Sequence, residues 1–254
     1  MVYDGTSINE VIEIVRQDTA LAGIMLKSVN SAYYGVARKI SSIHHAIAYL
    51  GFDNIYQVLI NDSINSIIRN NKESLDIQIH SVIVSIISKE IADNLKHYNK
   101  NNPMTIGLLH DVGKIVIILL KRKHQQIKEI IETLDDATLG AELLKTWDLP
   151  DCIFKVVKNQ HLPEYRPPDH ITHQYKDDIV ILYISHICYD ILMKKHTTST
   201  MYLDEYLLYL NMPQKNIKQL YHDVVLPMLL QQSKRLPPAV RDMITVQLPA
   251  QKNS

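Results

Sequence analysis

A histidine and an aspartate stand side by side at His110 and Asp111, in the run Leu-Leu-His-Asp-Val-Gly-Lys that ends at Lys114. If both side chains point into a cavity between helices, this imidazole and carboxylate can bind one metal ion together. A third ligand must then come from another helix. His80 is a candidate, because it falls on the inner face of the preceding predicted helix. Imidazole with carboxylate suits Zn²⁺, Fe²⁺, Ni²⁺ or Mn²⁺.

The same residues also have a simpler interpretation. A His-Asp dipeptide often arises by chance, and a buried histidine is commonly hydrogen-bonded to a helix carbonyl without binding any metal. On the residues alone, this second interpretation of His80 is the more common case, and the sequence leaves both open.

The elements that would position these side chains are predicted to be helices. Valine and isoleucine recur at intervals of three and four residues rather than two, so the predicted fold class is all-α, with no strand. Ser7 with Glu10 forms a capping box, Asp18 is an N-cap, and Pro103 is placed to begin the helix that holds His110. Further helices are predicted at about 42–50, 53–69, 76–95, 125–134, 137–147, 151–161, 177–194, 203–210 and 214–232.

Composition excludes several classes of protein. Lysine with arginine and aspartate with glutamate each number 27, so the formal net charge is zero and we expect no direct nucleic-acid binding. The two cysteines have no metal or redox spacing and are expected to be idle thiols in a reducing compartment. No signal peptide is predicted, and no apolar stretch reaches the roughly 20 residues of a membrane span. The sequence therefore predicts a cytoplasmic protein without membrane association.

Several runs resemble the HDOD family, a degenerate branch of the HD superfamily of metal-dependent phosphohydrolases. His80-Ser81 followed by the run from Gly107 to Lys114 is similar to the HD pattern. The more specific runs are VRQDTAL at 15–21, LKSVNSAYYG at 26–35, AIAYLG at 46–51 and LGAELLKTWDLP at 139–150. The resemblance implies a multi-helical, HD-domain-like bundle. We expect an N-terminal helical part at 1–74, an HD-like core at 75–234 and a flexible tail at 235–254.

The resemblance also implies a set of metal ligands. Catalytic HD enzymes use a histidine, a His-Asp doublet and a later aspartate, and His80, His110 and Asp111 occupy the first three places. The fourth place falls on His186, so an imidazole stands where the enzymes have a carboxylate. This change favours a soft divalent ion over Mg²⁺ and removes the acid expected to orient or deprotonate the attacking water.

Three other residues and one loop have two interpretations each. Second-site ligands of two-metal relatives would fall on Asp136 and His161, which could instead be a surface acid and a helix-end histidine. Lys114 would contact a substrate phosphate in related phosphohydrolases, or else extend from the pocket rim to solvent. The loop of Asn30 either contacts a ligand or fixes the N-terminal helices by hydrogen bonds, together with Ser31, Tyr33 and Tyr34.

Three functions follow. The first is a bacterial regulatory signal-transduction module without turnover, with protein partners in signalling and a residual site for a divalent metal. The second is a metal-dependent phosphohydrolase acting on nucleotides or cyclic dinucleotides, with Lys114 and Asp111 as catalytic residues and a nucleotide-type ligand. The third is a sensor that binds an ion without hydrolysis, for which His186 would be a useful ligand. The resemblance and the missing fourth acid favour the first.

Overall fold

The computed structural model describes residues 19–30, 35–50, 72–95, 103–195 and 200–233, together with Arg241 and Ile244. Within these residues every regular element is a helix and none is a strand, which confirms the all-α prediction. The predicted helices opened by Ser7 and by Asp53 and most of the predicted tail lie outside the described residues. The proposed division of the chain at residue 74 stays a prediction.

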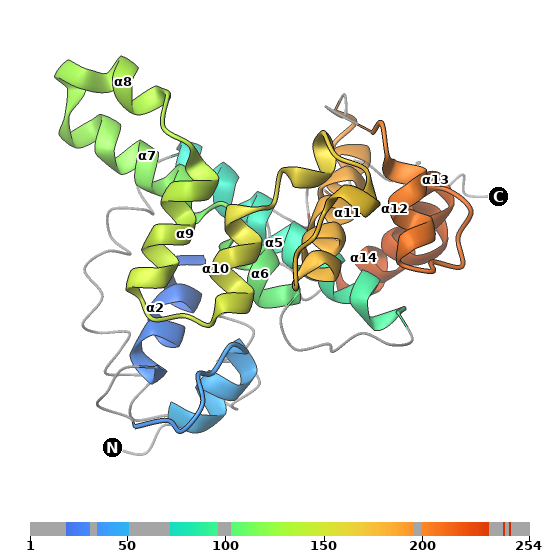
Figure 1. Ribbon diagram of the computed structural model, residues 1–254, viewed down its shortest axis with the longest axis horizontal. Coiled ribbons are helices and arrows are strands. Elements are labelled where there is room, and N and C mark those ends of the chain that lie inside the picture. Colours follow the sequence, from blue (N-terminus) through green and yellow to red (C-terminus); the bar gives the residue numbers. More distant parts are fainter. Residues whose placement is uncertain are drawn as a thin grey trace.

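Three helices form the middle of the molecule and bury most of their apolar side chains (Figure 1): α5 (Lys72–Asp93), α6 (Pro103–Leu109) and α11 (Lys176–Leu192). On one side of them lie α2 (Thr19–Val29), α9 (Asp136–Thr146) and α10 (Asp151–Lys158). At the opposite end lie α12 (Leu203–Tyr209), α13 (Ile217–Leu220) and α14 (Leu226–Gln232). The helices α7 (Val112–Lys123) and α8 (Lys128–Glu132) project away from the body as an arm.

Small residues let the central helices come close together. A Cβ atom on Gly107 would lie 2.6 Å from the Cα atom of Ser85, so the backbones of α6 and α5 are in contact there. The hydroxyl of Ser88 on α5 donates to the hydroxyl of Ser185 on α11 at 2.9 Å, and Ser185 donates to the carbonyl of Ile181. Close helix packing of this kind brings side chains on neighbouring helices within ligand distance of one another.

The chain does not continue as one helix through the His-Asp doublet, as the sequence suggested. The helix α6 ends at Leu109, and α7 begins at Val112 with Asp111 as its N-cap residue, so His110 and Asp111 form the junction. Neighbouring side chains on a regular α-helix point about 100° apart, which would turn one of the two away from a shared site. The break between the helices removes this restriction.

Asn30 ties the end of α2 to the segment that follows. Its side-chain amide nitrogen donates to the carbonyls of Leu26 and Ile40 at 2.9 and 2.8 Å, and its oxygen accepts from the Ile40 amide at 2.7 Å. The hydrogen-bonding interpretation of this loop is therefore confirmed for Asn30, whereas Ser31, Tyr33 and Tyr34 lie outside the described residues. Trp147, at the end of α9, packs against Gly23 of α2.

The C-terminal helical segment differs from the single helix predicted at 214–232. A π-helical turn at Tyr221–Val225 separates α13 from α14. Pro227 follows it and has no amide proton to donate to the carbonyl four residues earlier, so a change of hydrogen-bond register at this point has a local cause.

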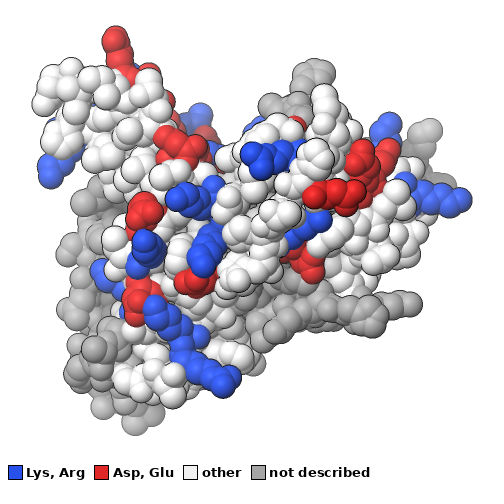
Figure 2. Space-filling view, in the orientation of Figure 1, with Lys and Arg blue, Asp and Glu red and all other residues white. Residues whose placement is uncertain are grey.

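The apolar helices and the surface charges bear on the predictions about membranes and nucleic acids. Among the described residues, one helical stretch, Pro103–Lys123, is long and apolar enough to span a membrane by length and composition, and 67% of its most apolar window is buried inside the fold. Such burial is typical of a core helix. Acidic and basic side chains are interspersed over the face drawn in Figure 2, and neither sign forms a continuous field there.

Candidate metal centre

Three histidines from three parts of the chain converge beside the α6–α7 junction. His80 comes from α5, His110 from the junction and His186 from α11. One ring nitrogen of each lies within 4.8 Å of the corresponding nitrogens of the other two. The ring centroids of His110 and His186 are 4.6 Å apart, and those of His80 and His186 are 5.0 Å apart.

Hydrogen bonding directs the His110 lone pair into this cluster. Its Nδ1 atom lies 2.7 Å from the carbonyl oxygen of Gly107, which can only accept, so Nδ1 carries the proton. In the neutral ring Nε2 is then the free acceptor, and it lies 3.2 Å from His80 Nε2. This is the spacing of two nitrogen ligands of one tetrahedral Zn²⁺, which is about 3.3 Å for metal–nitrogen bonds of about 2.05 Å. A backbone carbonyl behind a ligating histidine is also the usual arrangement at metal sites.

Asp111 lies beside the three rings but is held by a lysine. Its Oδ1 atom is 3.2 Å from His110 Nε2, and its Oδ2 atom is 3.5 Å from His80 Nε2. The Lys114 ammonium contacts both oxygens, at 2.8 and 2.9 Å, while the Asp111 side chain is 3% exposed. The carboxylate is therefore buried, paired and oriented toward the rings at once.

The pKa shifts of the clustered residues favour the protonation states that can bind a cation. Burial, followed by repulsion from His110, lowers the pKa of His80 to about 3, and the same two causes hold the pKa of His186 well below its usual value. Burial acts to raise the pKa of Asp111, but its interactions with His110 and Lys114 outweigh burial and hold that pKa well below normal. Near neutral pH the imidazoles of His80 and His186 are thus neutral, and they lie beside an ionised carboxylate.

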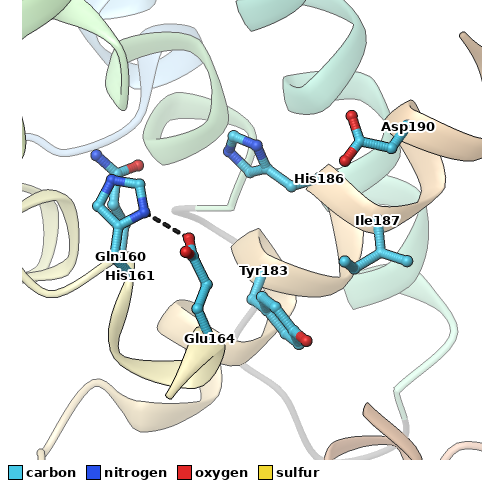
Figure 3. Close-up of a pocket in the computed structure, with 7 residues that line it drawn as sticks. All are labelled: Gln160, His161, Glu164, Tyr183, His186, Ile187 and Asp190. Atoms are coloured by element: carbon cyan, nitrogen blue, oxygen red, sulfur yellow. Dashed lines mark hydrogen bonds and ion pairs between the residues drawn. The ribbon is translucent and has the colours of Figure 1, made fainter. Parts of the chain in front are cut away.

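Two cavities flank the cluster. An open cavity of about 560 Å³ is lined by His80, Asp111 and Lys114, with Tyr189 at its wall. A much smaller cavity of about 60 Å³ is lined on the far side by His186, together with Gln160, His161, Glu164, Tyr183, Ile187 and Asp190 (Figure 3). The first is large enough for a small molecule and the second for water.

The residues expected to form a second metal site lie apart from the three rings. Asp136 begins α9 and lines the larger cavity, with its Oδ2 atom 4.0 Å from the Lys114 ammonium. His161 faces the smaller cavity, and its Nδ1 atom lies 2.6 Å from Glu164 Oε1, a hydrogen bond that raises the pKa of His161. A second-site role for Asp136 and His161 stays a prediction.

Two residues that contact the histidines were not predicted to do so. The Tyr189 ring packs edge-on against the His80 ring at a centroid distance of 4.3 Å, and its position three residues after His186 on the same helix is a signal that could have identified it. Gln160 is 4% exposed, and its Nε2 atom donates to the His110 carbonyl at 3.3 Å. No local pattern singles out this glutamine, because its partner is 50 residues away in the chain.

The residues present fit a divalent transition metal ion. Three imidazoles converge, one has its lone pair directed inward, and the buried Asp111 carboxylate lies 3.2 Å from His110 Nε2. Nitrogen ligands suit Zn²⁺, Fe²⁺ and Ni²⁺ better than Mg²⁺. When bound, such an ion would supply Lewis acidity and would join α5, α11 and the α6–α7 junction.

Solved structures share this fold. The described fold is similar to the MmoQ response regulator of Methylococcus capsulatus, with a TM-score of 0.63, 16% identity, and coverage of 86% of this chain and 90% of that one. A virulence factor from Campylobacter jejuni gives a TM-score of 0.53 at 17% identity, covering 95% of this chain and 88% of that one. At these identities the likeness concerns the fold alone.

Sequence comparisons give the family. An uncharacterised protein of Treponema pallidum is 23% identical over 185 residues, covering 63% of this chain and 36% of its own length. The protein YuxH of Bacillus subtilis, also uncharacterised, is 27% identical over 129 residues, covering 50% of this chain and 30% of its own length. In both relatives the match spans about a third of their length. The family model for the HDOD domain matches residues 2–163, well over half of the sequence, and the chain belongs to the HDOD family.

Proposed function

We propose that this chain is a cytoplasmic regulatory module of bacterial signal transduction that binds one divalent transition metal ion at His80, His110 and His186 and does not turn over a substrate. Membership of the HDOD family supports a regulatory role, and so does the likeness to a protein described as a response regulator. Its partners would be other signalling proteins.

The contact between Lys114 and Asp111 carries this proposal. A hydrolytic HD site needs carboxylates that bind the metal and orient a water molecule. Here one acid is replaced by His186, and both oxygens of the other are occupied by the Lys114 ammonium. The remaining donors are imidazole nitrogens, which bind a transition metal well but give no carboxylate base.

A bound ion would stabilise the folded state of the module. His80, His110 and His186 belong to α5, the α6–α7 junction and α11, so an ion held by all three would tie these elements together. Binding to the folded state alone stabilises it by about 2.7 kcal/mol when the free ion is at 100 times its dissociation constant. Metal occupancy would thus set the stability of the module, which is a means of regulation.

The test is thermal unfolding of the chelator-treated protein titrated with Zn²⁺, Ni²⁺, Mn²⁺ and Mg²⁺. We expect Zn²⁺ or Ni²⁺ to raise the melting temperature of the wild type and to have no such effect on His110→Ala. His170→Ala is the matched control, because His170 is exposed and lines neither of the two cavities beside the cluster. The proposal fails if no ion stabilises the wild type, or if His110→Ala responds as the wild type does.

A second candidate function is metal-dependent hydrolysis of a nucleotide or cyclic dinucleotide. The observation in its favour is the open cavity of about 560 Å³ that brings Lys114 and His80 to one surface. A phosphodiesterase screen of the metal-loaded protein, with Asp111→Ala as control, separates the two candidates. Turnover by the wild type that Asp111→Ala abolishes would replace the regulatory proposal with this one.

A further inference from the structure

The small cavity behind His186 contains a buried acceptor without a protein partner. Gln160 is 4% exposed, and its Oε1 atom has no hydrogen bond to any described residue. The other end of the same amide is fixed, since Nε2 donates to the His110 carbonyl at 3.3 Å. The amide therefore cannot turn to satisfy Oε1 without losing that bond. A buried acceptor is rarely left without a hydrogen-bond donor, so a donor from solvent is expected to fill this place.

His186 borders the same cavity from α11. Figure 3 shows its ring across the cavity from Gln160 and His161. Its cluster nitrogen lies within 4.8 Å of those of His80 and His110, and the two nitrogens of an imidazole cannot both point at one ion. The second nitrogen of His186 has no hydrogen bond to another described side chain in the structure, whereas His110 has its second nitrogen bonded to Gly107.

We infer that the cavity holds an ordered water molecule that accepts a hydrogen bond from the second ring nitrogen of His186 and donates one to Gln160 Oε1. The cavity volume of about 60 Å³ exceeds the 10–15 Å³ that one water needs. This water fixes the proton of His186 on the nitrogen that faces the cavity and leaves the lone pair of the other nitrogen directed at His80 and His110. Gln160 is thus a positioning residue for His186 through this water, and the bond from its Nε2 atom to the His110 carbonyl fixes the direction of Oε1.

The inference rests on the proposed metal site but has a readout that needs no metal. In the chelator-treated wild type, histidine ¹⁵N NMR should show His186 in one neutral tautomer. Gln160→Met removes the acceptor and should mix the two tautomers. The same substitution should weaken Zn²⁺ binding, measured by chelator competition, by about 10–100-fold, the usual effect of losing an outer-shell partner of a ligating histidine.

Two further variants separate the causes. Gln160→Glu keeps an acceptor for the water but loses the donor to His110, and it should bind Zn²⁺ at least as well as the wild type. Gln214→Met removes another buried carbonyl oxygen without a partner, at a residue that lines neither cavity, and should change neither readout.

The outcomes are distinct. The inference is overturned if His186 shows the same tautomers in the wild type and in Gln160→Met. It is also overturned if Gln160→Glu weakens Zn²⁺ binding as much as Gln160→Met does, because the effect would then come from the lost bond to the His110 carbonyl. If the wild type binds no Zn²⁺ while its His186 tautomer depends on Gln160, the metal proposal fails and the water site stands.

Discussion

The Lys114 ammonium lies 2.8 Å from one carboxylate oxygen of Asp111 and 2.9 Å from the other. A metal ion that used Asp111 as a ligand would have to displace this lysine from an almost fully buried acid. The contact with Lys114 therefore keeps Asp111 from acting as a metal ligand, although its carboxylate lies beside the three histidines.

Removing the lysine should destabilise the metal-free protein. Lys114→Met leaves the Asp111 carboxylate buried without its ammonium partner, and because Lys114 is 41% exposed we expect a loss of about 1–3 kcal/mol, below the cost of breaking a fully buried pair. Lys121→Met is the control, since its partner Glu132 is 45% exposed at 2.9 Å and such a pair contributes at most about 1 kcal/mol. Urea denaturation measures both, and equal losses would contradict the argument.

Acidification should destabilise the metal-free fold below about pH 6.5. The folded-state pKa of His80 is lowered to about 3, so the unfolded chain takes up this proton first as the pH falls. The contribution of neutral His80 to the free energy of unfolding is fully present above pH 6.5, the pKa of histidine in the unfolded chain. Below that pH it falls by about 1.4 kcal/mol per pH unit per histidine until the pKa of the folded state is reached. His186 shifts in the same direction.

The measurement is the free energy of unfolding of the wild type and of His80→Asn between pH 7 and pH 4. The variant lacks one of the titrating groups, so its slope should be smaller. Identical slopes would show that His80 is protonated in the folded state at these pH values.

The sequence predicted which histidines meet better than it predicted the backbone that positions them. Helical periodicity predicted that His80 faces the core, where it could meet the His110-Asp111 doublet, and the resemblance to the HD pattern alone added His186. The break between α6 and α7 at His110 was not predicted, since Leu109 and Val112 continue the apolar pattern on both sides of it. Long-range polar contacts such as Gln160 to His110 leave no local pattern at all.

Restoring an acid at position 186 should change the choice of metal. His186→Asp brings back the carboxylate of the catalytic HD pattern, and oxygen ligands favour Mn²⁺ and Mg²⁺ over Zn²⁺. We expect the ratio of Mn²⁺ to Zn²⁺ affinity to rise at least about 10-fold, the change of one ligand being worth more than 1.4 kcal/mol. His186→Asn is the control, because it is similar in size but neutral. If the two variants have the same metal preference, residue 186 does not contact the ion.

Gly113 determines how closely α7 approaches α9 and thereby where Lys114 and Asp136 meet. A Cβ atom on Gly113 would lie 1.9 Å from the Asp136 carbonyl oxygen and 2.8 Å from the Gly140 nitrogen, so Gly113→Ala forces the two helices apart. We expect a loss of about 1–3 kcal/mol in urea denaturation, typical of an overpacked contact. Gly140→Ala is the matched control, because its Cβ would come no closer than 3.1 Å to Gly113 while its gain in helix propensity is the same. A smaller loss for Gly140→Ala than for Gly113→Ala would locate the close contact on the α7 side, and the opposite order would contradict the packing described here.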